Sequence, residues 1–259
     1  MSNWLIVRGA GDIATGVIVR LVRCGFCVVA LESPRPSAIR RTVSLCEAVY
    51  AGEAQVEGIT ARLVSALPSE WPGYVPVLID TDCRVLQKAD LAALVDAILA
   101  KRNLGTRMDM APATVGLGPG FTAGEDVHAV VETMRGHDLG RVLWQGSALP
   151  NTGVPGMVGG YSVERVIHAP VEGKVHILRD IGSKVEKNEL LATIDRTPVC
   201  AKIPGVVRGM IREGYQVFRG MKMADVDPRE NADWHSVSDK ARAVSGGVVE
   251  ALMAMGVRP

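Results

Sequence analysis

The sequence has almost no excess of charge of either sign. Its 29 lysines and arginines nearly balance 28 aspartates and glutamates, so the formal net charge is +1, and basic residues never occur in a run longer than two. Proteins that bind DNA or RNA mainly through phosphate contacts carry a strongly basic surface. The composition therefore argues against nucleic acid as a partner, and any anion must be bound locally.

The sequence also lacks a long apolar run near its first residue. The segment MSNWLIVRGAGD has no basic start and only a short apolar stretch before Arg8, too short for a signal peptide or a membrane span. We therefore expect a cytoplasmic protein with no membrane partner.

Cysteine is too scarce for a disulfide framework. Five cysteines, an odd number, are scattered over 259 residues, which is typical of a reducing compartment. Cys24 and Cys27 have CxxC spacing, but no second pair completes a zinc site, and structural packing is the favoured interpretation.

The first feature present is a dinucleotide-like unit. Apolar residues 4–7 predict a buried strand, which a G-x-G-x-x-A turn connects to an apolar helical pattern. A second apolar strand, residues 26–31, ends at an acid in the position where dinucleotide-binding folds hold a ribose hydroxyl. The candidate binding residues of this unit are Gly9, Ala10, Gly11, Asp12, Ile13 and Glu32.

Asp12 leaves two interpretations of this turn open. A pyrophosphate binds the free N–H groups at a helix N-terminus, and the Asp12 carboxylate competes for the same donors. In the alternative, Asp12 is the helix N-cap and the glycines only permit a tight turn.

The middle of the chain alternates apolar strands with helical patterns. Strands are expected over residues 75–80, 114–117 and 142–144, a helix over 39–49, and residues 91–101 fit either state. This alternation predicts the α/β fold class, with a Rossmann-like, mostly parallel, doubly wound sheet.

One strand end in this region carries polar residues. Thr81, Asp82 and Cys83 follow the strand of residues 75–80, at the carboxyl edge where ligands sit in open α/β sheets.

A glycine-rich segment carries the second candidate site. Glycine is needed where φ is positive or where a ligand approaches the main chain, so the loop from Gly116 to Gly124 predicts an anion-binding nest. We expect this loop to share one cleft with the turn at Gly9, because both follow parallel strands. Its candidate residues, with those of the preceding loop, are Lys101, Arg102, Asn103, Gly118, Pro119, Gly120, Phe121 and Thr122.

A helix is expected after the glycine loop. It would bury Val127, Val130, Val131 and Met134, and show His128, Glu132 and Arg135 on another face. His128, Arg135 and the following His137 complete the candidate binding set. A metal on His128, Glu132 and His137 is the weaker alternative to an exposed, salt-bridged face, so no metal is assigned.

An internal repeat marks a second domain. Residues 168–195 and 200–227 align at a constant offset of 32, as two copies of one unit with a shared core do. The spacing resembles the barrel-sandwich hybrid of lipoyl and biotinyl domains. Residues 195–198, between the copies, contain no lysine that could carry a cofactor, so a non-carrier domain is expected.

These patterns predict three regions. They are a Rossmann-like α/β ligand-binding domain over 1–165, a barrel-sandwich β domain over 166–226, and a tail over 227–259 whose helix packs on the first domain. Ser238 is the expected cap of that helix, and Gly246 and Gly247 within it indicate close approach to a neighbour.

Motifs along nearly the whole chain resemble one known family. VRGAGDIATGV, AKRNLGTRMDMAP, GLGPGFTAGEDVHAVVETMRGHDLGRV and AKIPGVVRGM are similar to the YqeB-type proteins of the selenium-dependent molybdenum hydroxylase system. The resemblance implies an accessory protein that helps to mature the cofactor of such a hydroxylase, which would be its partner. It implies no catalytic residues.

Three functions follow. The leading one is a maturation factor whose Rossmann-type cleft binds a small anionic ligand, either a nucleotide or a molybdenum cofactor. The alternatives are an NAD(P)-dependent oxidoreductase, which Gly9, Gly11 and Glu32 suggest, and a non-enzymatic adaptor that docks on the hydroxylase through the small β domain. The sequence leaves open whether the chain is an enzyme and whether it forms a homo-oligomer.

Overall fold

The computed structural model describes residues 3–87 and 90–259. The chain forms two compact units. Unit 1 contains Met1–Pro36, Ser44–Thr152 and Val237–Pro259, and unit 2 contains Ser37–Val43 and Gly153–Ser236. The last segment of the chain therefore belongs to the same unit as the first. In the described residues no helix is long and apolar enough to cross a membrane.

Unit 1 is built on a nine-stranded mixed sheet with the order β10-β9-β7-β6-β1-β2-β5-β4-β3. Neighbouring strands are parallel from β9 to β4, and the outer pairs β9–β10 and β3–β4 are antiparallel. The strands are β1 (Trp4–Arg8), β2 (Val28–Glu32), β3 (Glu53–Val56), β4 (Ile59–Leu63), β5 (Val75–Ile79), β6 (Leu91–Asp96), β7 (Thr114–Leu117), β9 (Ala129–Val131) and β10 (Val142–Leu143). A separate ribbon pairs β8 (Thr122–Ala123) with β11 (Gly146–Ser147).

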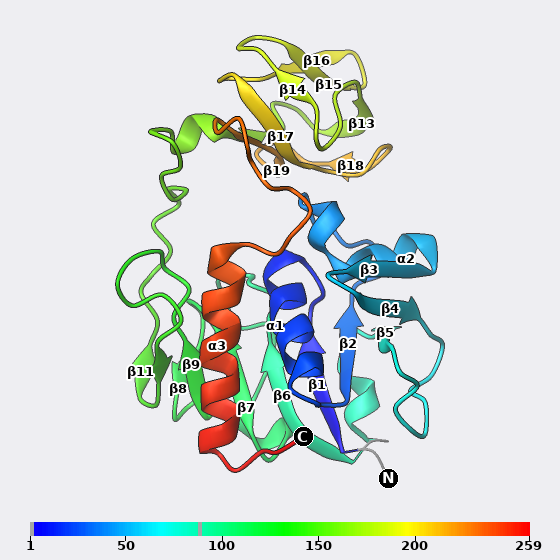
Figure 1. Cartoon of the computed structure of the whole chain (residues 1–259), viewed down its shortest axis with the longest axis vertical. Coiled ribbons are helices and arrows are strands. Elements are labelled where there is room, and N and C mark those ends of the chain that lie inside the picture. Colours follow the sequence, from blue (N-terminus) through cyan, green and yellow to red (C-terminus); the bar gives the residue numbers. More distant parts are fainter. Residues whose placement is uncertain (1–2, 88–89) are drawn as a thin grey trace. The chain divides into compact units, whose positions relative to one another are not determined.

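Two long helices, α1 (Asp12–Arg23) and α3 (Asp239–Ala254), pack side by side against this sheet (Figure 1). They approach closely because Gly16 of α1 has no side chain: a Cβ there would lie 2.6 Å from the Ala241 Cβ of α3. The Ser238 hydroxyl accepts a hydrogen bond from the Ala241 N–H at 3.1 Å, which confirms the expected cap of α3.

Loops and short turns close the other face of the sheet. There Trp4, Ile6, Leu78 and Leu94 form a core, together with side chains of the loop between β4 and β5 and of two 3-10 turns. These turns are η3 (Arg84–Gln87) and η4 (Met108–Met110). A face that is covered by loops has room for a pocket between the loops and the sheet.

The prediction of a helix is wrong for two segments of the chain. Residues 39–49 hold two 3-10 turns, η1 (Arg41–Val43) and η2 (Leu45–Glu47), before the four-residue helix α2 (Ala48–Ala51). Val130 and Val131 lie in β9, where β7 and β10 pair with them on either side. Their helical spacing coincides with a run of β-branched residues, which is well accommodated in a buried strand. Residues 91–96 are the strand β6.

These differences correct the expected fold class. A doubly wound sheet places a crossover helix between successive parallel strands, on both faces. In the described part of unit 1, α1 is the one long helix between two sheet strands, and loops, turns or hairpins make the other connections. Unit 1 is a large mixed sheet rather than a Rossmann-like domain.

Unit 2 consists of two four-stranded sheets, with the orders β12-β19-β17-β14 and β16-β15-β13-β18. The strands β13, β14 and β15 recur 32 residues later as β17, β18 and β19, and β13 pairs with β18 while β14 pairs with β17. Each copy thus gives its short strand to the sheet of the other copy. The strands are β12 (Val166–His168), β13 (Gly173–Ile177), β14 (Lys184–Val185), β15 (Leu190–Ile194), β16 (Thr197–Cys200), β17 (Gly205–Met210), β18 (Gln216–Val217) and β19 (Lys222–Asp227); η5 (Val163–Arg165) precedes them.

A cluster of ion pairs lies inside unit 2. The buried Asp227 carboxylate contacts Arg229 at 2.6 Å and Arg208 at 3.6 Å, and the adjacent Asp225 contacts Arg165 and Arg208 at 2.8 Å. Burial alone would raise the pKa of Asp227. Hydrogen bonds from the Arg229 side chain and backbone, with the Arg208 charge, outweigh burial and hold this pKa below its usual value.

We expect Asp227→Asn to destabilise the protein by about 3 kcal/mol at neutral pH, because two arginines lose part of their charge compensation. The folded-state pKa lies below the unfolded value of about 3.9. The stabilisation by Asp227 is therefore complete above that value and is lost as the pH falls toward the folded-state pKa. Urea unfolding of both proteins at several pH values measures this, and a difference that stays constant into acid would contradict it.

Alanine substitutions at two adjacent glycines of α3 should change the stability of the protein in opposite directions. A Cβ at Gly247 would overlap the Gly140 carbonyl oxygen, whereas a Cβ at Gly246 meets no atom within 4 Å. We expect Gly247→Ala to destabilise the protein by about 1–3 kcal/mol through overpacking. Gly246→Ala is the matched control and should stabilise it by up to about 1 kcal/mol, because alanine favours the helix. Equal effects in thermal unfolding would show that α3 does not pack through Gly247.

Candidate functional site

The turn after β1 is occupied by the protein's own carboxylates. Glu32 accepts hydrogen bonds from the N–H groups of Ala10 and Ser33, each at 2.8 Å, and Asp12 accepts one from the Ile13 N–H at 2.9 Å. The N–H groups of Ala10 and Ile13, which a pyrophosphate would use, therefore already bind carboxylates of the protein. Glu32, which would hold a ribose, is likewise engaged by the protein's own backbone. The N-cap of α1 is Gly11, so the expectation that Asp12 is the N-cap is wrong.

A buried ion pair links the ends of the two central strands. Arg8 ends β1, Asp96 ends β6, and their Nη1 and Oδ2 atoms lie 3.1 Å apart, with both side chains almost fully buried. The Thr106 hydroxyl donates to Asp96 at 2.5 Å and accepts from Arg8. Arg8 also donates to the carbonyl oxygens of Thr81 at 3.2 Å and Leu104 at 3.4 Å. Four chain segments meet at this cluster.

The glycine loop lies at the same carboxyl edge as the turn at Gly9, because β7, β6 and β1 are parallel. Internal packing explains its glycines. Gly120 has a φ of +109°, and a Cβ there would lie 2.5 Å from the Arg102 Cα. At Gly116 a Cβ would meet the buried ring of Phe121 at 2.5 Å. The structure therefore brings Gly120 and Arg102 together by backbone contact.

Hydrogen bonds also join Asn103 to the glycine loop. Its amide donates to Asp126 at 3.3 Å, and Asp126 accepts from the Thr122 N–H at 2.8 Å. Gly118 lies against Thr133, Pro119 is half-buried, and Lys101 is exposed. These contacts hold the loop in place, and its role in ligand binding stays a prediction.

Within the described residues, the contacts given below for the three remaining candidates do not join them to this loop. His128 contacts the Thr114 hydroxyl at 2.8 Å, and Arg135 forms two hydrogen bonds of 2.7 Å with Asp239 at the start of α3. His137 is exposed. Glu132 is buried and accepts from the N–H groups of Thr133, Met134 and Leu149. Within the described residues, no three His, Cys, Asp or Glu side chains are grouped to hold a metal.

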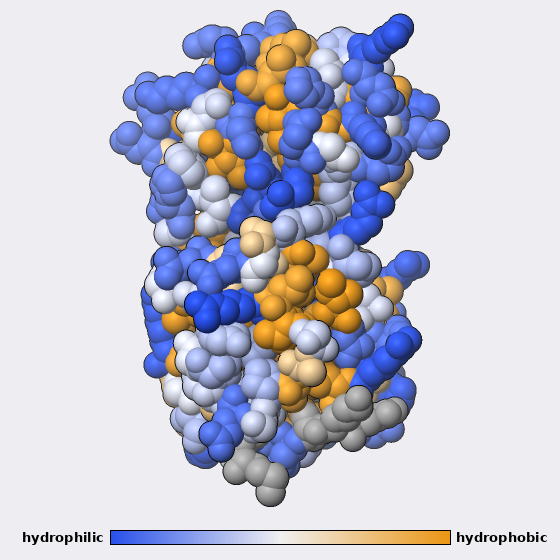
Figure 2. All heavy atoms as spheres, turned by 90° about the vertical axis from the view of Figure 1, so that its right-hand side faces the viewer, coloured by the Kyte–Doolittle hydropathy of each residue, from blue (hydrophilic) through white to orange (hydrophobic). Residues whose placement is uncertain are grey.

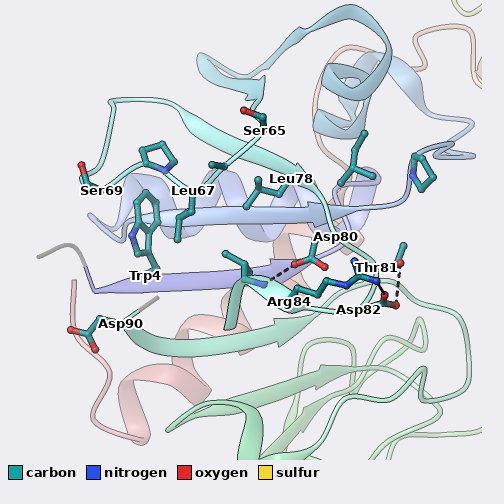
Figure 3. Close-up of a pocket in the computed structure, with 15 residues that line it drawn as sticks. Trp4, Ser65, Leu67, Ser69, Leu78, Asp80, Thr81, Asp82, Arg84 and Asp90 are labelled. Atoms are coloured by element: carbon teal, nitrogen blue, oxygen red, sulfur yellow. Dashed lines mark hydrogen bonds and ion pairs between the residues drawn. The ribbon is translucent and has the colours of Figure 1, made fainter. Parts of the chain in front are cut away.

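A pocket of about 710 Å³ lies on the loop-covered face of unit 1 (Figure 3). Its lining comes from four separate parts of the chain: β1, the segment after β2, the loop after β4, and β5 with the segment between β5 and β6. Apolar side chains gather on the same side of unit 1 in the lower part of Figure 2. The lining residues are Trp4, Pro34, Ser65, Ala66, Leu67, Pro68, Ser69, Leu78, Ile79, Asp80, Thr81, Asp82, Arg84, Val85 and Asp90.

The pocket has an apolar part and a polar rim. In Figure 3, Trp4, Leu67 and Leu78 lie together, and Asp80, Thr81, Asp82 and Arg84 lie beyond the end of β5. The lining has three carboxylates, those of Asp80, Asp82 and Asp90, and one guanidinium, so its formal charge is 1 − 3 = −2. This lining favours a neutral or cationic ligand over an anion.

The polar rim is held in place from within. Asp80 accepts a hydrogen bond from the Val85 N–H at 2.9 Å, and Arg8 binds the Thr81 carbonyl. By contrast, the ion pair between Asp82 and Arg84, 2.8 Å long, is exposed, with 61% and 80% of these side chains accessible. Asp82 and Arg84 are therefore the rim groups that can turn toward a ligand.

Only part of this pocket could be predicted from the sequence. Thr81 and Asp82 stand after an apolar strand, at the expected edge, whereas Trp4 and Leu67 carry no pattern that distinguishes them from core residues. Their meeting depends on the strand order β1-β2-β5.

No family model matches the chain. Comparison with solved structures finds the product-bound ectoine utilization protein EutE (DoeB) of Ruegeria pomeroyi, with 14% identity over 87% of this chain and 85% of that chain, and a TM-score of 0.27. It also finds the succinylglutamate desuccinylase/aspartoacylase of Rhodobacter sphaeroides, with 16% identity over 88% and 86%, and a TM-score of 0.28. An aspartoacylase family protein of Mesorhizobium loti has 11% identity over 88% and 86%, and a TM-score of 0.29.

The predictions that relied on a Rossmann-like domain are corrected. Unit 1 has a large mixed sheet in which, among the described residues, α1 is the one long helix between two strands. The expected Rossmann-like domain is therefore wrong. The maturation factor with a nucleotide or molybdenum-cofactor cleft, the oxidoreductase and the adaptor are withdrawn with it. At such TM-scores, the neighbours' activities are not carried over to this chain.

A curated relative is similar along almost the whole chain. The uncharacterized protein YqeB of Escherichia coli K12 is 50% identical over 254 residues, which cover 96% of this chain and 47% of that protein. The chain thus spans about half the length of its relative. This similarity supports a YqeB-type protein.

Proposed function

We propose that unit 1 binds a small organic molecule in the pocket between the sheet and the loop that follows β4. The volume of about 710 Å³ carries this proposal, since small-molecule sites usually measure roughly 300–1,000 Å³ and combine apolar walls with a few polar groups. Trp4, Leu67 and Leu78 supply the apolar part, and the carboxylates supply the polar groups.

The charge of the lining selects the ligand class. A formal charge of −2 disfavours phosphates and carboxylates, and Asp80 and Asp82 accept hydrogen bonds from amines or hydroxyls. The ligand that fits is an amphipathic molecule with an apolar, preferably aromatic, body and an amine. This is the opposite of the anionic ligand that the sequence suggested.

A matched pair of probes tests this ligand class. Tryptamine and indole-3-acetate share the indole ring and differ in the sign of their charge. We expect tryptamine to bind at least about tenfold more tightly in calorimetry, because a charge-assisted hydrogen bond contributes about 1.5–3 kcal/mol. Indole-3-acetate binding as tightly as tryptamine would contradict the proposal.

Two variants locate the binding. Ala66 is exposed at the pocket wall, so Ala66→Trp should fill the pocket and abolish tryptamine binding while the fold is kept. Ala254, exposed at the end of α3, gives the control Ala254→Trp, which should bind normally. If both variants bind tryptamine as the unchanged protein does, the ligand lies elsewhere.

We further propose that this YqeB-type protein has a selenium-dependent molybdenum hydroxylase as a partner. The support is the resemblance of its motifs and the 50% identity to YqeB. Affinity purification of the tagged chain from cells that express such a hydroxylase tests the partnership. We expect the hydroxylase to be enriched relative to a tagged unrelated protein, and equal recovery would contradict the proposal.

A further inference from the structure

A second hollow in unit 1, of about 230 Å³, lies between α1 and α3. Its lining comes from the second half of α1 and from the residues around the start of α3. The lining residues are Gly16, Val19, Arg20, Arg23, Cys24, Val237, Arg242 and Ser245.

Three guanidinium groups line this hollow, and one carboxylate compensates them. Glu57, in the turn between β3 and β4, contacts Arg23 at 3.2 Å and Arg242 at 2.6 Å, and accepts from the Val237 N–H at 3.0 Å. Arg20 is exposed and forms no ion pair with any carboxylate among the described residues. The three arginines with Glu57 therefore carry a formal charge of 3 − 1 = +2.

The end of α1 explains only part of this arrangement. Arg20 and Arg23 lie in its last turn, where cations interact favourably with the helix dipole. Arg242 belongs to the first turn of α3, where a cation opposes the dipole. An anion in the hollow would offset the unfavourable position of Arg242, and it would also give the exposed Arg20 a charged partner.

We propose that this hollow binds a phosphate group through Arg20, Arg23 and Arg242. The planar guanidinium group matches phosphate oxygens with pairs of hydrogen bonds. The Ser245 hydroxyl donates to the Arg242 carbonyl oxygen at 2.8 Å, so the arginines are the donors of the site. The site is separate from the carboxylate-lined pocket, so the two proposals stand or fall independently.

Calorimetric titration of the full chain with inorganic phosphate and with glycerol 3-phosphate tests the proposal, against chloride at the same ionic strength. We expect binding, with an affinity that falls roughly tenfold in Arg20→Ala, because one charge-assisted contact is lost. Arg20→Ala should change the melting temperature little, since this side chain is exposed and makes no ion pair within the described part of the chain. Arg219→Ala, at an exposed arginine of unit 2, is the matched control and should bind normally.

The thiol of Cys24 supplies a second readout inside the hollow. Of the five cysteines, Cys24 is exposed, Cys46 and Cys83 are buried, and Cys27 and Cys200 are half-buried. In the unchanged protein, phosphate should slow the alkylation of Cys24 by iodoacetamide more than it slows that of Cys200. In Arg20→Ala, phosphate should slow the alkylation of Cys24 much less. If glycerol 3-phosphate binds more tightly than phosphate, the ligand of the hollow is a phosphorylated metabolite. If phosphate binds more tightly, the ligand is the free anion. No binding of either compound, unchanged affinity in Arg20→Ala, or no protection of Cys24 would each overturn the proposal.

Discussion

The buried ion pair between Arg8 and Asp96 is the constraint on which the carboxyl edge of the sheet depends. Two charges out of water are tolerated only when each is compensated and hydrogen-bonded, and here Thr106 and the carbonyl of Thr81 complete the set. The loop that forms the rim of the larger pocket is thereby fixed to the two central strands. Many polar side chains at this edge bind other parts of the chain and so stabilise the structure. Glu32 is one example: it accepts a hydrogen bond from the glycine turn that has the dinucleotide-binding spacing.

The two hollows described above in unit 1 have opposite formal charge. The larger has an apolar floor and a carboxylate rim, and it lies where loops, rather than a long helix, cover the sheet. The smaller lies along two packed helices and is lined by arginines. A cationic molecule and a phosphate would each be repelled by the wrong hollow, so the two sites would select different ligands. The sequence predicted a single anion-binding cleft at the carboxyl edge, and neither hollow corresponds to it.

Local signals predicted a large part of the architecture. The apolar runs of β1, β2, β5 and β7 appear as buried strands, the pattern after Gly11 forms α1, and Ser238 caps α3. The copies in unit 2 are visible as an offset of 32 residues because each copy needs the same glycines and core positions. The prediction failed where the same residues were compatible with both a helix and a strand. Val130 and Val131 have the spacing of an apolar helix face, but they pair with β7 and β10 and therefore form the strand β9.

The sequence by itself determined the elements whose cause is local, namely apolar runs, caps and the repeat. The tertiary structure alone decided what the polar and glycine residues do. Gly120 adjoins the backbone of Arg102, and Arg135 pairs with Asp239, which is 104 positions away in the chain. Likewise, Trp4 and Asp80 line one pocket only because β2 places β5 two strands from β1. Such contacts depend on strand order and register, which are set by the burial of the whole sheet rather than by any short segment.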